Sequence, residues 1–187
     1  MTRILGKVGR DGATYTDPLA RSNPDAAGID ASPALRQHVA RILRLLEERD
    51  AAAAEKLAQA TCVAFPEAAE AARLHGMALL ALNRTQAARA ALSEAVRLAP
   101  GDYLARCNYA SALIASGDAG PAVSILQQAA REHPNDADVR NNLANALHAI
   151  GDDARARDEY LAALAESPGH SDAALNLAAV ELSLDML

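Results

Sequence analysis

Residues 103–136 read YLARCNYASALIASGDAGPAVSILQQAAREHPND, and this stretch is one copy of the unit that decides the fold. An alanine of the unit recurs every 34 residues, at Ala54, Ala88, Ala122 and Ala156. A proline follows each alanine by twelve residues, at Pro66, Pro100, Pro134 and Pro168. Two series with one period and a fixed offset are not expected by chance, so the chain is predicted to contain four tandem repeats.

Each repeat is predicted to contain two helices joined by a short turn. In the first repeat, Ser32 is a suitable N-cap and Pro33 suits the first helical turn. An apolar stripe at helical spacing follows, at Leu35, Val39, Ile42, Leu45 and Leu46. Turns are predicted near residues 47–50, 83–84, 117–118 and 151–152. In the two Gly-Asp turns, the glycine ends one helix in a left-handed conformation and the aspartate caps the next.

A ninth helix is predicted from Ser171 to Leu187, without a partner helix. One place in the first helix of every pair carries leucine, at Leu45, Leu79, Leu113 and Leu147. The ninth helix carries Glu181 at that place. Because a carboxylate is tolerable there only where no partner helix packs, the ninth helix is predicted to be a terminal cap. Three leucines of this helix still leave apolar surface, at Leu182, Leu184 and Leu187.

Composition and charge limit the classes of function. The chain has 187 residues, of which 51% are hydrophobic, enough for a domain with a sizeable core. A formal net charge of −6 argues against a nucleic-acid partner, which requires a basic face. Cys62 and Cys107 are interpreted as small core residues in a reduced compartment. No apolar run approaches the roughly 18 residues of a membrane helix, and no secretory signal begins the sequence. We therefore expect a soluble, cytoplasmic protein with no membrane partner.

Catalytic and metal-binding motifs are absent from the sequence. There is no H-E-x-x-H, C-x-x-C or G-x-S-x-G motif, and the five histidines are scattered without metal-ligand spacing. The stretch GKVGRDG at residues 6–12 lacks the spacing of a phosphate-binding loop. The sequence therefore predicts a protein that is not an enzyme and has no cofactor and no metal site.

The repeats divide the chain into an arm and one domain. Residues 1–32 contain too many glycines and prolines for a helix and are predicted to form a non-repeat N-terminal arm. Residues 33–187 are predicted to form the repeat domain. Its repeats are expected at about 35–68, 69–102, 103–136 and 137–170, followed by the terminal helix at 171–187.

Over about residues 35–187, the unit resembles the tetratricopeptide-repeat family. The family has a small residue in the middle of the first helix, matched by Gly76, Ala110, Ala144 and Ala178. It has a large residue in the second helix, matched by Leu92, Leu126 and Tyr160, and a small one three places later, matched by Ala95, Ala129 and Ala163. The first repeat departs at these three places, with Ile42, Ala58 and Thr61. The early tryptophan of the family is absent.

This resemblance implies an all-α fold, an α-solenoid in which helix–turn–helix units stack into a right-handed superhelix. The first helices would line a concave groove, in which members of the family mostly bind extended or helical peptides without catalysis.

Asparagine recurs at equivalent places on the expected groove face, at Asn108, Asn142 and Asn176. The pattern resembles the asparagine ladder in the repeats that precede the catalytic part of O-linked N-acetylglucosamine transferases, where these amides hold a substrate peptide by its backbone. One amide offers both donors and acceptors, so it can bind any peptide unit. Alternatively, the three asparagines reflect only repeat ancestry and polar helix faces. Three further residues are predicted to extend this peptide-binding surface: Asn141, Asn145 and His148. A histidine such as His148 is more typically solvated or locally bonded.

The first two repeats are predicted to make their half of the groove apolar. The equivalent places there carry Leu43, Leu46, Leu74, Met77 and Leu80. Leu74 and Met77 are included among the predicted peptide contacts. Since an exposed apolar groove usually has a partner, we hypothesise that the arm covers this half through Tyr15, Pro18 and Leu19, in cis or in a neighbouring subunit. A homo-oligomer would then form through the arm or the terminal helix.

Acidic residues accompany the asparagine ladder at Asp138 and Asp172. Some relatives hold a terminal carboxylate with lysine and arginine at these groove positions, and two aspartates would repel that ligand. Asp138 and Asp172 suit a basic peptide better. The two aspartates are equally well interpreted as helix N-terminal acids that the helix dipole favours.

Three functions follow from these observations. The leading interpretation is a non-catalytic interaction module that binds an extended segment of a protein or peptide partner in its groove. The second is the substrate-recognition part of a glycosyltransferase, sulfotransferase or hydroxylase system, because repeats of this kind precede such domains in bacterial proteins. The third is a structural scaffold that self-associates through its apolar end helix.

Overall fold

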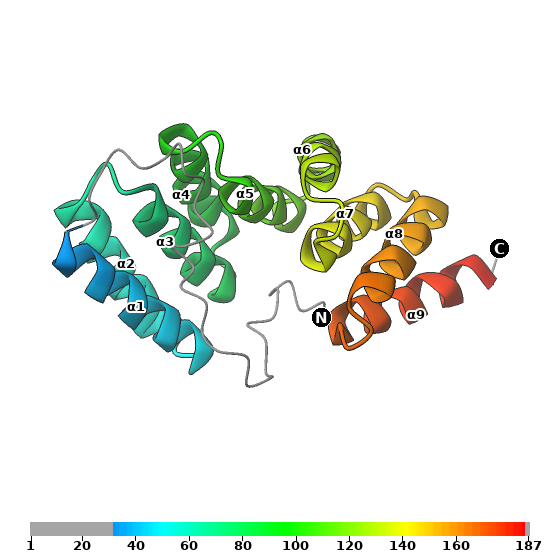
Figure 1. Ribbon diagram of the computed structural model, residues 1–187, viewed down its shortest axis with the longest axis horizontal. Helices are drawn as coiled ribbons and strands as arrows, with labels where there is room; N and C mark the ends of the chain where they lie inside the picture. The colour runs from blue at the N-terminus through cyan, green and yellow to red at the C-terminus, as the bar shows by residue number, and fades with distance from the viewer. Residues whose placement is uncertain (1–31, 186–187) are drawn as a thin grey trace. The chain divides into compact units, whose positions relative to one another are not determined.

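The computed structural model describes residues 32–185, and every regular element in that range is an α-helix (Figure 1). The helices are α1 (Pro33–Glu47), α2 (Ala51–Ala64), α3 (Ala69–Ala81), α4 (Thr85–Leu98), α5 (Tyr103–Ala115), α6 (Ala119–Glu132), α7 (Ala137–Ala149), α8 (Asp153–Glu166) and α9 (Ser171–Asp185). The predicted α-solenoid of tandem helix pairs is confirmed. The arm, with Tyr15, Pro18 and Leu19, lies outside the described residues. No described helix has the length and apolarity needed to span a bilayer.

Each helix pair turns through a residue in the left-handed conformation. These residues recur every 34 positions, with φ of 61° at Arg49, 58° at Asn83, 84° at Gly117 and 83° at Gly151. Glycine and asparagine adopt this region readily, whereas Arg49 carries a steric cost there. The left-handed glycines predicted for the third and fourth turns are therefore confirmed.

Aspartate and serine side chains begin several helices as N-caps. The Ser32 hydroxyl accepts from the Leu35 amide at 3.4 Å, and the Asp50 carboxylate accepts from the Ala53 amide at 3.0 Å. Asp152 accepts from the Arg155 amide at 3.3 Å, as the Gly-Asp turn predicts. Asp118 also occupies an N-cap position, but its side chain makes no capping hydrogen bond, which corrects that part of the prediction.

The four closing prolines end the second helix of every pair. The residue before each proline has left the helical conformation, with φ between −129° and −136°, because a following proline disfavours the helical region. These four residues are Phe65, Ala99, His133 and Ser167. The proline series is thus the boundary between repeats.

Alanine lets the two helices of each pair approach closely. The four alanines of the 34-residue series are fully buried, as are the large residues Leu92, Leu126 and Tyr160 of the second helices. A Cβ atom added to Gly76 would lie 2.3 Å from the Leu92 Cγ atom, which is far inside van der Waals contact. The absent side chain of Gly76 is therefore the space that Leu92 fills.

The first repeat reverses these sizes. Ile42 occupies the small place on α1, Ala58 occupies the large place on α2, and both are fully buried in one core cluster. The bulky group has moved from the second helix to the first, so the interface keeps a large residue against a small one. The departure of the first repeat from the family pattern is a compensated exchange.

The described residues fall into two compact units, residues 32–105 and 106–185, with the boundary inside α5. In the first unit, Val39, Leu45 and Leu74 join the cluster that α1, α2 and α3 form. In the second, α7 packs against α6, α8 and α9. The four leucines that share a place with Glu181 are buried, whereas Glu181 is exposed among the described residues.

Candidate peptide-binding site

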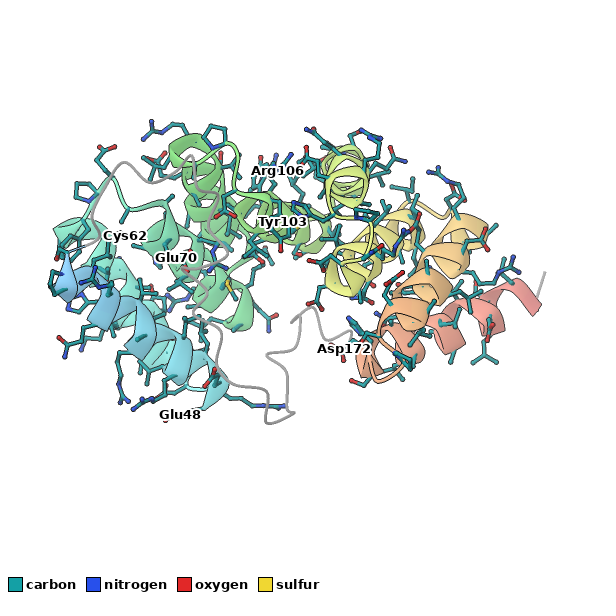
Figure 2. All side chains as sticks on the ribbon, in the orientation of Figure 1. Glu48, Cys62, Glu70, Tyr103, Arg106 and Asp172 are labelled. Carbon is teal, nitrogen blue, oxygen red and sulfur yellow. The ribbon has the colours of Figure 1, made fainter. Side chains whose placement is uncertain are left out.

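The asparagines of the predicted ladder all lie in the second unit. Asn108 is on α5, Asn142 on α7 and Asn176 on α9, and each side chain is half-buried. Arg106 lies two residues before Asn108 on α5 and forms an ion pair with Glu132 of α6. Figure 2 labels Arg106 on α5. We name Asn108, Asn142, Asn145 and Asn176 the asparagine set.

Two members of the asparagine set are joined directly across helices. The Asn176 Nδ2 atom donates to the Asn145 Oδ1 atom at 3.0 Å, which links α9 to α7. The same oxygen accepts from the Tyr160 hydroxyl of α8 at 2.6 Å. Burial raises the pKa of the Tyr160 phenol far above its ordinary value, so the hydroxyl keeps its proton and donates. Asn145 is thus the acceptor that ties three helices together.

This network leaves hydrogen-bonding capacity unused. The Asn145 carbonyl has both lone pairs occupied, but its NH2 group keeps two donors. Asn176 keeps one donor and its carbonyl. Within residues 32–185, Asn108 and Asn142 have no side-chain hydrogen bond. These half-buried amides can therefore donate to and accept from a ligand.

Tyr160 was not among the residues predicted for the site, although its position in the repeat could have indicated its role. It fills the large place in α8, where leucine stands in the two preceding repeats. A buried tyrosine needs a partner for its hydroxyl, and an asparagine on the adjacent helix can supply one. The replacement of leucine by tyrosine opposite an asparagine was thus the available signal.

Replacing Tyr160 by phenylalanine is expected to reduce stability by about 1 kcal/mol, because it removes one buried hydrogen bond while Asn145 still accepts from Asn176. Chemical unfolding measures this loss. Tyr109→Phe is the matched control, since no hydrogen bond of the Tyr109 hydroxyl is found among the described residues, and it should change little. Equal stabilities of the two variants would contradict the role given to Tyr160.

Asn141 lies deeper than its neighbour Asn142. It is buried, and its Oδ1 atom has no hydrogen-bond partner among the described residues. Its equivalents Val39, Arg73 and Cys107 are also buried, so this place belongs to the packing of the repeats. A peptide on the surface would not reach Asn141 without local opening, and we leave it out of the asparagine set.

His148 is held by a local contact at the end of α7. Its Nδ1 atom lies 2.5 Å from the Asp153 Oδ1 atom, and the Ser183 hydroxyl donates to Asp153 Oδ2 at 3.0 Å. The hydrogen bond with His148 holds the pKa of the Asp153 carboxyl below its ordinary value. Both the serine and the histidine bond to the carboxylate and not to each other, so the three do not form a nucleophile–base pair.

The two acids of the predicted site occupy helix N-termini. Asp172 lies in the first turn of α9, as Figure 2 shows, and Asp138 lies in the first turn of α7. The Ala173 amide donates to His170 Nδ1 at 3.2 Å, so the ring proton is on Nε2, which donates to Asp138 Oδ1 at 3.1 Å. His170 was not predicted to take part, and it fixes the orientation of Asp138.

The apolar residues of the prediction lie in the other unit. Leu74 is fully buried in the core of α1–α3, which corrects its expected place on an exposed surface. Met77 is partly buried against that core, and its sulfur atom lies 3.4 Å from an Arg73 nitrogen. Arg73 also forms a two-pronged ion pair with Glu70, at 2.8 and 2.5 Å. The structure therefore does not gather Leu74 and Met77 with the asparagines in one unit.

Among the described residues, no group of three or more histidine, cysteine or acidic side chains is arranged to hold a metal ion. Cys62 is half-buried and Cys107 is buried, and both are free thiols. Burial raises the pKa of the Cys62 thiol, which leaves it less reactive at neutral pH. The chemistry that this arrangement supplies is hydrogen bonding by amides and carboxylates.

Two family models of the tetratricopeptide repeat match the chain. One matches residues 79–141 and 113–163, and the other matches residues 39–103, so that together they span well over half of the chain. No curated protein shows a significant sequence match.

Solved structures share the fold at low sequence identity. A thermophilic tetratricopeptide repeat protein of Thermus thermophilus is 18% identical, with a TM-score of 0.69 over 79% of this chain and 81% of its own. YrrB, a repeat protein with an unusual peptide-binding site, is 19% identical, with a TM-score of 0.60 over 83% and 78%. An O-GlcNAc transferase mutant of Thermobaculum terrenum is 22% identical, with a TM-score of 0.65 over 73% of this chain and 26% of its own.

Proposed function

Because the chain belongs to the tetratricopeptide repeat family, we propose that it is a protein-interaction module whose second unit binds an extended peptide by its backbone. The asparagine set is the binding element. Asn108, Asn142 and Asn176 bond to peptide N–H and C=O groups, and the NH2 group of Asn145 adds further donors.

The observation that carries this proposal is the unused hydrogen-bonding capacity of half-buried amides. Asn142 and Asn145 are one helical turn apart on α7, so they project from one face. Asn176 is tied to Asn145 at 3.0 Å, which places its remaining donor and its carbonyl beside the same face. A side chain that is already fixed loses little conformational entropy on binding, so its new hydrogen bonds contribute more to affinity.

Backbone recognition predicts tolerance of peptide sequence and modest affinity. An extended peptide presents one N–H and one C=O per residue, about every 3.3 Å. Each amide–backbone hydrogen bond contributes roughly 0.5–1.5 kcal/mol net, so a short ladder with some apolar contact gives roughly micromolar affinity. Asp138 and Asp172 at the helix N-termini then favour a peptide with basic residues at one end.

Replacing Asn108, Asn142 and Asn176 together by alanine is expected to weaken peptide binding at least about tenfold, because three hydrogen bonds of roughly 0.5–1.5 kcal/mol each are lost. A random peptide library selected on the full chain supplies the ligand, and isothermal titration measures its affinity for both proteins. Asn135→Ala, at an exposed position outside the asparagine set, is the control and should bind normally.

Circular dichroism should show the same helical content for the triple variant and the parent chain. Unchanged affinity of a well-folded triple variant would refute the proposed site. If the triple variant lost both binding and helical content, the single variants would separate the two effects. Asn142→Ala is the most informative of them, because it alters no hydrogen bond among the described residues.

A further inference from the structure

One face of α9 is apolar and uncovered by the part of the chain that the structure describes. Leu175 and Leu182 are each 67% exposed, and Ala178 and Ala179 between them are exposed as well. These four residues follow an i, i+3, i+4, i+7 pattern and so share one side of the helix. The opposite side of α9 packs on α7 and α8 and buries Ala173 and Val180. We name the four exposed residues the α9 stripe.

Two of the four residues of the α9 stripe, Leu175 and Ala178, have equivalents that are covered in the other repeats. The place of Leu175 is buried in all four preceding first helices, at Val39, Arg73, Cys107 and Asn141. The place of Ala178 is buried at Ile42, Gly76, Ala110 and Ala144. Leu175 and Ala178 therefore stand at places that a further helix covers throughout this fold, whereas the places of Ala179 and Leu182 are half-buried at Asn145 and exposed at His148 in α7.

The sequence of α9 is close to a palindrome. Residues 174–178 read Ala-Leu-Asn-Leu-Ala, and residues 183–179, taken backwards, read Ser-Leu-Glu-Val-Ala. Each half gives a small residue, a leucine, a polar residue, an aliphatic residue and an alanine. Two antiparallel helices related by a two-fold axis meet through such a sequence, because each position then faces its mirror position.

We propose that two copies of this chain pair through the α9 stripe, antiparallel about a two-fold axis between Ala178 and Ala179. Leu175 of one copy then packs against Leu182 of the second copy, and the alanines let the helix axes approach closely at the centre. The contact borders the asparagine set, since Ala179 and Leu182 occupy in α9 the places that Asn145 and His148 occupy in α7.

The first helix gives no comparable surface for a head-to-tail contact. In the later repeats, three places on the first helix face the preceding repeat. On α1 these places carry Gln37, Arg41 and Arg44, which are all exposed. Those places are buried in α7, at Val139, Leu143 and Ala146. A polar face cannot cover two leucines favourably, so the stripe finds its complement in another α9 and the assembly closes at two copies.

Charge gives the pairing a characteristic salt dependence. The helix from Ser171 to Asp185 contains acidic residues and no lysine or arginine. Two copies therefore repel each other, and screening by salt should strengthen their association. A basic helix from a different protein would instead be attracted to α9 and would dissociate as salt rises.

Sedimentation equilibrium of the full chain tests the proposal. We expect a monomer–dimer equilibrium that shifts toward dimer between 50 mM and 500 mM salt, and a monomer at all concentrations for Leu175→Glu combined with Leu182→Glu. Leu161→Glu is the matched control, since Leu161 is an exposed leucine of α8 outside the stripe, and it should dimerise normally. A parent chain that stays monomeric at every concentration and salt, or that grows beyond a dimer, would overturn the proposal.

Cysteine cross-linking tests the orientation. Under mild oxidation Ala179→Cys should give a covalent dimer, because residue 179 lies at the axis. Ser171→Cys should not, because it lies between seven and eight residues, or about 11 Å, from the axis along the helix. The parent chain, with the same two native cysteines, gives the background. Equal cross-linking at both positions would indicate parallel helices and contradict the antiparallel arrangement.

Discussion

Replacing Gly76 by isoleucine is expected to destabilise the first unit by about 3 kcal/mol, the upper end of what overpacking usually costs. Even the Cβ atom of a new side chain would lie 2.3 Å from the Leu92 Cγ atom, and isoleucine adds three more carbons. The gain in helix propensity over glycine, roughly 0.5 kcal/mol, does not offset this. Chemical unfolding followed by circular dichroism measures the loss.

A second substitution should recover much of this stability. Leu92→Ala alone is expected to cost about 2–5 kcal/mol through the cavity that it leaves. The double variant reproduces the arrangement of Ile42 and Ala58, in which the first helix supplies the bulk and both residues are fully buried. The combined loss should therefore be clearly smaller than the sum of the single losses. Additive losses would show that the sizes at this place are not coupled.

Replacing Glu70 by alanine is the other change for which we expect a large effect, a loss of about 3 kcal/mol. Glu70 holds the Arg73 guanidinium by two hydrogen bonds, and the Arg73 side chain is only 9% exposed. Removal of one partner of a buried ion pair leaves an uncompensated charge, which costs roughly 3–5 kcal/mol. The lower end applies because the Glu70 side chain is 23% exposed and water can enter.

The equivalent places of other repeats supply the control for this prediction. The place of Arg73 carries Val39 in the first repeat and Cys107 in the third, both buried. Arg73→Val should therefore cost less than Glu70→Ala, since the remaining carboxylate can be hydrated. The double variant should resemble Arg73→Val in its unfolding midpoint. If Glu70→Ala were harmless, the pair would not be stabilising the charge of Arg73.

The fold could be predicted almost completely because its signals are local and repeated. The left-handed glycines, the prolines and the N-cap residues Ser32, Asp50 and Asp152 mark helix ends by the backbone conformations and hydrogen bonds that they allow. The observed helices begin within two residues of the predicted positions. The exchange of sizes at Ile42 and Ala58 required the structure, because each residue alone is only a departure from the family pattern.

The candidate site was less predictable because periodicity indicates the face of a helix but not how deeply each residue is covered. Leu74 and Asn141 have the spacing of surface residues, yet neighbouring helices bury them. The bonds among Asn145, Tyr160 and Asn176 join residues 15 and 31 positions apart, and no local pattern indicates them. Asn142 and Asn176 could be singled out because their place recurs every 34 residues.

The claim that the asparagine set binds a peptide by its backbone is tested most directly by methylation of peptide nitrogens. A selected peptide is synthesised with one N-methyl group at each position in turn, and a second series carries alanine in place of each side chain. N-methylation at alternate positions should weaken binding to the parent chain about tenfold. It should have little effect on binding to the variant in which Asn108, Asn142 and Asn176 are all alanine. Most peptides of the alanine series should bind the parent chain nearly normally. Full binding of every N-methylated peptide, with loss of binding in the alanine series, would contradict the account.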